Sequence, residues 1–291
     1  MDEWPLLKRA VGFMGMVLVL WSPVVIPLLP TLLQSWSTSN PSRVAELASV
    51  VGLYVAVFIL VMLWGKRVRK YENPFRQYGL DFKPSIKKKV QEFLKAFAGG
   101  ITVVLLIQFV NTILGAAIFS RPPYLPHPFD AVKWLKGCAR LLLLIVRGFT
   151  AATFVVVVEE LLFRSWMPTE IAIDLGYHQS IIITGLVFAL FQRSPRSIPG
   201  LWLLSLGLTG TRERSQGNLI VPIGFRTGII AASFVLQSGG FLTYNLSSPV
   251  WIAGTRPLQP FSGVVGLAVS LALALILYPR HSSETKMQKY N

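Results

Sequence analysis

Eight apolar runs follow one another along the chain, and their length and composition predict helices in a lipid environment. The runs cover about 10–33, 47–64, 96–119, 141–163, 181–191, 201–210, 219–237 and 261–279. A helix needs ~20 apolar residues to cross a bilayer, so the fifth and sixth runs are short for a full crossing. Such runs occur where a helix is tilted, broken or covered by its neighbours. The pattern predicts an all-α polytopic membrane bundle of about eight transmembrane helices.

Composition places the chain in the same class. Of its 291 residues, 53% are hydrophobic and only 14% are charged, which is too little charge for a soluble domain of this size. The net charge of +15 comes from basic residues that lie between the apolar runs. We therefore expect them to face anionic lipid headgroups rather than nucleic acid. With one cysteine, Cys138, and no HExxH sequence, the chain predicts neither an internal disulfide nor a zinc protease site, and no metal or other cofactor is expected.

The distribution of basic residues predicts the orientation in the membrane. The loop Gly65–Lys95 carries ten lysines and arginines, so it should lie on the cytoplasmic side, or the stromal side in a plastid. With eight crossings both termini share that side, where 18 basic residues gather against 8 on the far side. We expect an integral protein of the plasma or thylakoid membrane.

Three regions are predicted along the chain. Residues 1–95 form two N-terminal helices and the basic loop, residues 96–279 form a six-helix core, and residues 280–291 form a basic polar tail. The stretch Ile86–Phe97 has apolar residues at helical spacing with a lysine face, and it is interpreted as an amphipathic lead-in to the third helix.

The stretch VVVVEELLFRSW, residues 155–166, contains the only two acidic residues inside an apolar run, Glu159 and Glu160. A charged side chain at bilayer depth costs roughly 2.5–3.5 kcal/mol on insertion scales, so a pair of them needs a reason. On a helix Glu160 and Arg164 are neighbours four residues apart and can form an ion pair. Two interpretations remain open: an ionic cluster that locks the helices together, or a buried carboxylate that activates water as a general base.

Three stretches in the same order resemble the motifs of one family. Glu159 to Arg164 (EELLFR) is similar to EExxxR, residues 185–192 (GLVFALFQ) occupy the place of FxxxH, and residues 217–228 (GNLIVPIGFRTG) that of GSLWLPIGLHAG. These motifs are those of the CAAX prenyl protease and bacteriocin-processing (CPBP, or Abi) intramembrane proteases. Residues 249–254 and 260–263 resemble cyanobacterial and plastid members in particular. The resemblance spans roughly 96–279 and implies a CAAX-protease-like core.

The resemblance also implies roles for individual residues. In active members a glutamate of the first motif activates water, while two histidines and an asparagine of the later motifs position that water or stabilise the oxyanion. In this chain Gln192 and Arg226 stand at the histidine positions and Ile230 at the asparagine position. Gln192 can still donate a hydrogen bond to an oxyanion but cannot take up a proton, and Ile230 can do neither.

Arg226 changes the predicted chemistry most. It lies about seven residues into the seventh run, a depth of ~10 Å, and Glu160 lies at ~6 Å from the same face. We therefore expect the two side chains to meet and Glu159, Glu160, Arg164 and Arg226 to form a neutral buried cluster. The alternative is that Arg226 extends to the headgroups.

Three functions follow, in order of preference. The first is a protease-like protein with little or no peptidase activity that binds another membrane protein or a lipid-linked ligand, as an assembly factor or accessory subunit of a membrane complex. The second is an active glutamate-type intramembrane endopeptidase in which Glu159 or Glu160 is the base and Gln192 serves the oxyanion. Ion or solute transport is weakly suggested by the intramembrane charges, but the chain lacks the repeated, broken halves typical of secondary transporters.

Overall fold

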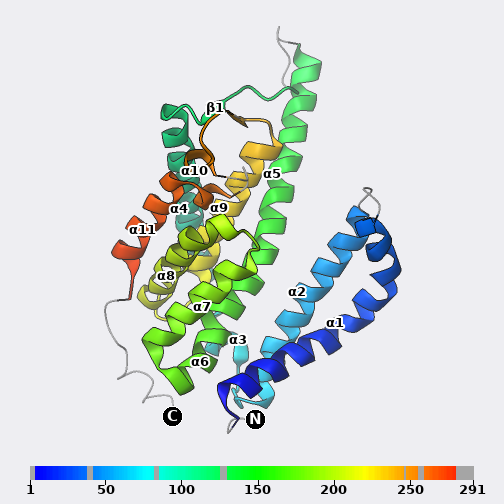
Figure 1. Cartoon of the computed structure of the whole chain (residues 1–291), viewed down its shortest axis with the longest axis vertical. Coiled ribbons are helices and arrows are strands. Elements are labelled where there is room, and N and C mark those ends of the chain that lie inside the picture. Colours follow the sequence, from blue (N-terminus) through cyan, green and yellow to red (C-terminus); the bar gives the residue numbers. More distant parts are fainter. Residues whose placement is uncertain are drawn as a thin grey trace.

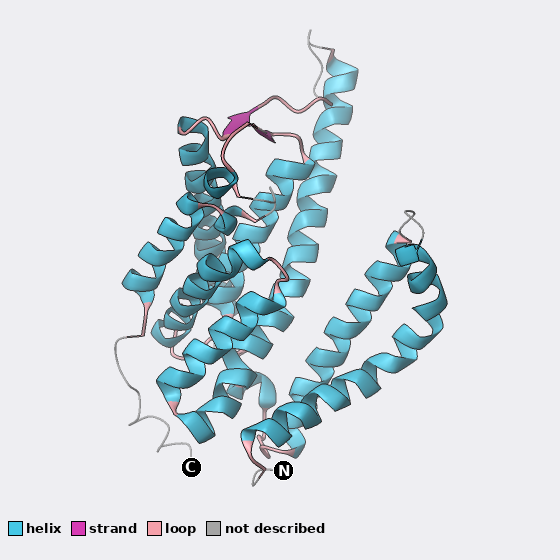
Figure 2. Ribbon diagram, viewed as in Figure 1, coloured by secondary structure: helices cyan, strands magenta, loops and turns pink. Residues whose placement is uncertain are grey.

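The chain folds into a bundle of helices with two short strands at one end (Figure 1, Figure 2). The computed structural model describes residues 4–37, 42–81, 85–124, 130–245, 247–254 and 259–279. The elements are α1 Leu6–Ser37, α2 Arg43–Arg67, α3 Pro74–Gln77, α4 Ile86–Ile113, β1 Ala117–Phe119, α5 Ala131–Glu160, a π-helical turn Leu161–Trp166, α6 Met167–Leu175, α7 Tyr177–Phe191, a 3-10 turn Pro195–Ser197, α8 Ile198–Arg214, α9 Ile220–Ser238, β2 Leu242–Tyr244, α10 Val250–Ala253, a 3-10 turn Pro260–Ser262 and α11 Val264–Leu277.

The predicted all-α membrane bundle is confirmed. In the described part of the chain, five helical stretches are long and apolar enough to cross a membrane, namely α1, α2, α4, the continuous stretch Ala131–Leu175 and α9. The helices α7 and α11 are apolar but shorter. The chain is therefore built as an integral membrane protein.

The centre of the bundle is the pair α4 and α9, whose backbones touch through glycines. A Cβ on Gly100 would lie 2.0 Å from the carbonyl oxygen of Phe225, and one on Gly228 would lie 2.2 Å from that of Phe97. Membrane helices associate closely where small residues line the contact, since lipid supplies no hydrophobic driving force. This packing fixes the position of Arg226, two residues before Gly228.

The third helix ends earlier than expected. We predicted a helix over 96–119, but α4 stops at Ile113, and Gly115 follows with a φ of +69°, a conformation that commonly terminates helices. Residues 117–119 then form β1, which pairs antiparallel with β2. The helix prediction is thus wrong for the last six residues, because strand pairing with a segment far along the chain satisfies their backbone groups instead.

Helices α1 and α2 form a hairpin that leans away from the other helices toward its loop end (Figure 1). At the opposite end aromatic packing joins it to the bundle. Phe13 stacks on Trp166 at a centroid distance of 3.8 Å, and Trp64 meets the same ring edge-on at 5.8 Å. The hairpin is therefore anchored beside the π-helical turn.

The division into three regions stays a prediction. Helix α4 begins at Ile86 and runs through the expected boundary at residue 95, so the amphipathic stretch is the first part of that helix. The predicted tail, 280–291, lies outside the described residues.

Candidate functional site

The glutamates lie where a regular helix widens. Helix α5 ends at Glu160 and continues as the π-helical turn Leu161–Trp166 into α6, which has Pro168 in its first turn. Proline has no backbone N–H and cannot donate to the carbonyl four residues earlier, that of Arg164. The side chain of Arg212, on α8, donates to that carbonyl oxygen instead. Wide turns of this kind inside α-helices often mark functional sites.

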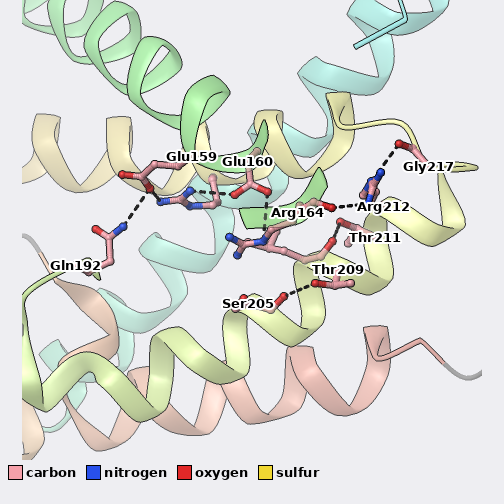
Figure 3. A network of polar contacts seen from close by, with 11 residues as sticks. Glu159, Glu160, Arg164, Gln192, Ser205, Thr209, Thr211, Arg212 and Gly217 are labelled. Carbon is pink, nitrogen blue, oxygen red and sulfur yellow. Dashed lines mark hydrogen bonds and ion pairs between the residues drawn. The ribbon is translucent and has the colours of Figure 1, made fainter. Parts of the chain in front are cut away.

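Glu159, Glu160, Arg164 and Gln192 lie in one network of polar contacts (Figure 3). Arg226 bridges the two glutamates. Its Nη2 lies 2.5 Å from Oε2 of Glu159, and its Nη1 lies 2.9 Å from Oε1 of Glu160. Arg226 is 4% exposed and Glu160 is 0% exposed, so the arginine does not extend to the headgroups. The predicted pairing is present, and one guanidinium holds two carboxylates.

The remaining carboxylate oxygens also have neighbours. Oε1 of Glu159 accepts a hydrogen bond of 2.6 Å from the Tyr54 hydroxyl, and its Oε2 accepts one of 3.0 Å from Nε2 of Gln192. Oε2 of Glu160 lies 3.4 Å from Nε of Arg164, an ion pair without a hydrogen bond. Two carboxylates and two guanidinium groups give the cluster no formal net charge.

An aromatic ring completes the enclosure. Phe188, on α7, is fully buried, and the guanidinium carbons of Arg164 and Arg226 lie 4.2 and 4.6 Å from its ring centroid. Cations are attracted to the face of an aromatic ring, most strongly where water is excluded. Arg164 forms no hydrogen bond with its guanidinium nitrogens in the described part of the chain, so the ring and Glu160 are its main partners.

The structure brings five of the six predicted residues together. Glu159, Glu160, Arg164, Gln192 and Arg226 share the polar cluster, which we call the glutamate–arginine cluster. Ile230, one turn after Arg226 on α9, packs against the neighbouring hydrophobic core and adds no polar atom. Over the described ranges, no group of three or more His, Cys, Asp or Glu side chains is placed to hold a metal ion.

Comparison with known families gives a partial match. Residues 141–232 match the model of the family described as Type II CAAX prenyl endopeptidase Rce1-like. The match supports the Rce1-like family for this chain. It covers less than half of the 291 residues, but the Rce1-like segment contains all five residues of the glutamate–arginine cluster. No curated protein matches the chain.

Tyr54 was missed by the sequence analysis. It comes from α2, outside the Rce1-like segment, and reads in the sequence as one more residue of an apolar run. Its ring also lies 6.2 Å from that of Phe154 on α5. No periodicity reveals which side of a lipid-exposed helix faces a glutamate on another helix, so only the packing of the hairpin identifies this contact.

A second buried ionic cluster, also missed, surrounds Glu170 on α6. The Arg69 side chain donates to both carboxylate oxygens of Glu170, at 2.8 and 2.5 Å, and Nε1 of Trp64 donates to one at 3.1 Å. Arg9, on α1, lies 3.6 Å from the carboxylate, donates to the Glu170 backbone carbonyl and pairs with Asp174. Arg9 and Glu170 are 1% and 3% exposed. We call this group the basal cluster, and it ties the α1–α2 hairpin to α6.

Tyr78 packs close to the basal cluster, in the segment after α3. It is 2% exposed, and burial raises the pKa of its phenol above the ordinary value, with nearby Tyr71 and Glu170 adding to the effect. The hydroxyl therefore stays neutral in the folded protein over the physiological range. It adds no charge to the basal cluster.

Proposed function

We propose that this protein is an Rce1-like membrane protein whose endopeptidase site has been disarmed, and that it acts by binding a partner. The partner would be another membrane protein or a lipid-linked ligand, and the protein would serve as an assembly or accessory subunit. The observation that carries the proposal is the hydrogen bonding of Arg226 to both Glu159 and Glu160.

This bonding opposes general-base catalysis. A catalytic carboxylate must offer a lone pair to water within hydrogen-bond distance. Three of the four oxygens of Glu159 and Glu160 already accept hydrogen bonds from Tyr54, Gln192 and Arg226, and the fourth faces Arg164. Both carboxylates are also nearly inaccessible to solvent. The cluster is thus arranged as a set of ion pairs in which the lone pairs of three carboxylate oxygens are already engaged.

The resemblance described above adds to the argument. We infer that Gln192, Arg226 and Ile230 take the places of the two histidines and the asparagine of active members. Gln192 donates one of its two amide N–H groups to Glu159, which holds the amide against the carboxylate and leaves one donor for an oxyanion. Losing one of several coupled catalytic groups can already cost many orders of magnitude in rate, and here three are inferred to have changed.

One feature favours the alternative of an active endopeptidase. Among the four oxygens of Glu159 and Glu160, Oε2 of Glu160 accepts no hydrogen bond from the described residues. If Arg164 moved slightly, this oxygen could contact water. An active enzyme would therefore use Glu160 as its base, and Glu160→Gln is the variant that tests for it.

The test compares the wild type with the variant Gln192→His/Arg226→His/Ile230→Asn in liposomes that contain a pool of membrane-tethered peptides, with new peptide termini counted by mass spectrometry. We expect no cleavage by the wild type and cleavage by the triple variant that is lost when Glu159→Gln or Glu160→Gln is added. Cleavage by the wild type that disappears in Glu160→Gln would refute the disarmed site.

Partner binding is tested separately. Gentle detergent extraction of the tagged wild type after photo-crosslinking should yield one companion in stoichiometric amount, and the same companion with Glu160→Gln if that variant is folded. A product that stays monomeric and free of companions under crosslinking would contradict an accessory role.

We also propose the orientation inferred from charge. Eight crossings would place both termini on one side of the membrane. With the basic loop Gly65–Lys95 on the cytoplasmic or stromal side, a C-terminal epitope tag should be removed by protease in inside-out vesicles and protected in right-side-out ones. The reverse pattern would invert the orientation.

A further inference from the structure

Three helices of the bundle are too short to cross a bilayer of ordinary thickness. Helices α7, α8 and α11 contain 15, 17 and 14 residues. At 1.5 Å per residue they span ~21–26 Å, against a hydrocarbon core of ~30 Å. Helix α5 has 30 residues and extends past them at the end that carries β1 (Figure 1). The surface over the three short helices is therefore recessed at that end.

A groove lies in this recessed surface. It has a volume of about 480 Å³, within the ~300–1,000 Å³ of small-ligand sites, and it runs between the starts of α8 and α11 and the helix α10. Its walls are almost entirely apolar and include Trp251, Phe261, Val264 and Leu267. Phe261 is 3% exposed, whereas Trp251 is 64% exposed, so the floor is fixed and one wall is open.

Arg196 is the charged side chain that lines the groove. It is exposed and makes no hydrogen bond or ion pair with any described residue through its side chain. The side chain of Arg196 therefore brings a positive charge to the end of an apolar groove, where an anion or water has to compensate it. The start of α11 also favours an anion, because its N-cap residue, Gly263, has no side chain that could accept hydrogen bonds from the first backbone N–H groups of the helix.

We propose that this groove binds an anionic phospholipid, with the phosphate on Arg196 and an acyl chain along Val264 and Leu267. Charge complementarity selects the occupant: an apolar channel ending at a single unpaired cation matches a molecule with an anionic head and an apolar tail. Basic pockets between membrane helices bind anionic headgroups in the same way. Trp251 lies at the open wall, where indole rings contact the boundary between headgroups and acyl chains. The bound lipid fills the recess left by the short helices.

Trp251 provides the readout. The protein is reconstituted into nanodiscs of neutral phosphatidylcholine that contain a small fraction of brominated phosphatidylglycerol or brominated phosphatidylcholine, and quenching of tryptophan fluorescence is measured. The difference between the wild type and Trp251→Phe isolates the signal of Trp251. We expect brominated phosphatidylglycerol to quench this signal at about one fifth of the mole fraction needed by brominated phosphatidylcholine.

Arg196→Gln should abolish this preference, so that both lipids quench equally. The matched control is Arg43→Gln, an exposed arginine at the start of α2 that does not line the groove and should keep the fivefold preference. Both variants change exposed side chains, and retained tryptophan emission of the unquenched samples checks that they are folded. Equal quenching by the two lipids in the wild type, or an unchanged preference in Arg196→Gln, overturns the proposal. Absence of quenching by either lipid overturns it as well, since the groove is then covered by protein.

Discussion

Replacing Arg226 by glutamine should destabilise the protein strongly, because one side chain neutralises two buried carboxylates. Arg226→Gln removes hydrogen bonds of 2.5 and 2.9 Å to Glu159 and Glu160 and changes the formal charge of the cluster from zero to −1. Glu159 keeps its bonds from Tyr54 and Gln192, and Glu160 keeps only the 3.4 Å ion pair with Arg164.

The size of the loss follows from these contacts. Two unit charges ~4 Å apart attract each other by ~4 kcal/mol at an effective dielectric constant of ~20. The summed attraction of Arg226 for its two glutamates is therefore larger than the loss of stability that we expect. Part of that attraction offsets the cost of burying the arginine itself. Removing one partner of a buried ion pair typically costs ~3–5 kcal/mol, and we expect ~4 kcal/mol here. Adding Glu159→Gln restores a neutral cluster and should recover about half of the loss, ~2 kcal/mol.

The free energy of unfolding is measured by titration with SDS in mixed micelles, followed by tryptophan fluorescence. Arg43→Gln is the matched control, since Arg43 is an exposed arginine at the start of α2 and its replacement should change stability by less than ~0.5 kcal/mol. A loss below ~1 kcal/mol for Arg226→Gln, or a double variant that is less stable than the single one, would refute the reasoning that the cluster is a set of mutually compensating charges.

Three further predictions concern packing and the contacts missed in the sequence. Glu170→Gln should lower the free energy of unfolding by ~3 kcal/mol, because it removes the negative charge that holds the basal cluster together. Amide hydrogen exchange should then rise first in the α1–α2 hairpin, and an equal rise in all helices would contradict this. Gly228→Ala should cost ~1–3 kcal/mol in SDS titrations, since its Cβ would lie 2.2 Å from the carbonyl oxygen of Phe97, whereas Gly15→Ala, with nothing within 4 Å, should be neutral or slightly stabilising. Tyr54→Phe should lose ~1.5–3 kcal/mol, the value of a hydrogen bond to a charged group, and an unchanged midpoint would show that water replaces the hydroxyl.

The sequence predicted the depth of residues along the membrane normal better than it predicted which side of each helix faces its neighbours. Counting residues from the helix ends at 1.5 Å each placed Glu160 and Arg226 within ~4 Å of the same depth, and the two are hydrogen bonded. The same reasoning could not show that Tyr54 faces Glu159, because the side of α2 that meets α5 is set by packing of the hairpin. Nor could it show the π-helical turn, which places Arg164 against Phe188 as well as Glu160.

The basal cluster was missed for a different reason. Glu170 follows Arg164 by six residues and lies beyond the apolar run 141–163, where nothing in the sequence indicates burial. In the structure the helix continues through the π-helical turn into α6, and the segment after α2 folds back so that Arg69 reaches the same carboxylate. A charged residue near the end of a span can therefore be as deeply buried as one in its middle, and only the tertiary contacts distinguish the two.

The glutamate–arginine cluster explains how both glutamates could persist without catalysis. With Arg226 and Arg164 in place, replacing either Glu159 or Glu160 by an apolar residue leaves a net positive charge among charged residues that are at most 4% exposed. Each single loss then carries the cost of an unpaired buried charge, while losing all four together requires several coordinated changes. The presence of two intramembrane carboxylates is thus no evidence of activity by itself. An active endopeptidase and a disarmed one differ in whether a carboxylate oxygen is free to bind water. Among the oxygens of Glu159 and Glu160, only Oε2 of Glu160 accepts no hydrogen bond from the described residues, so this atom decides between the two functions.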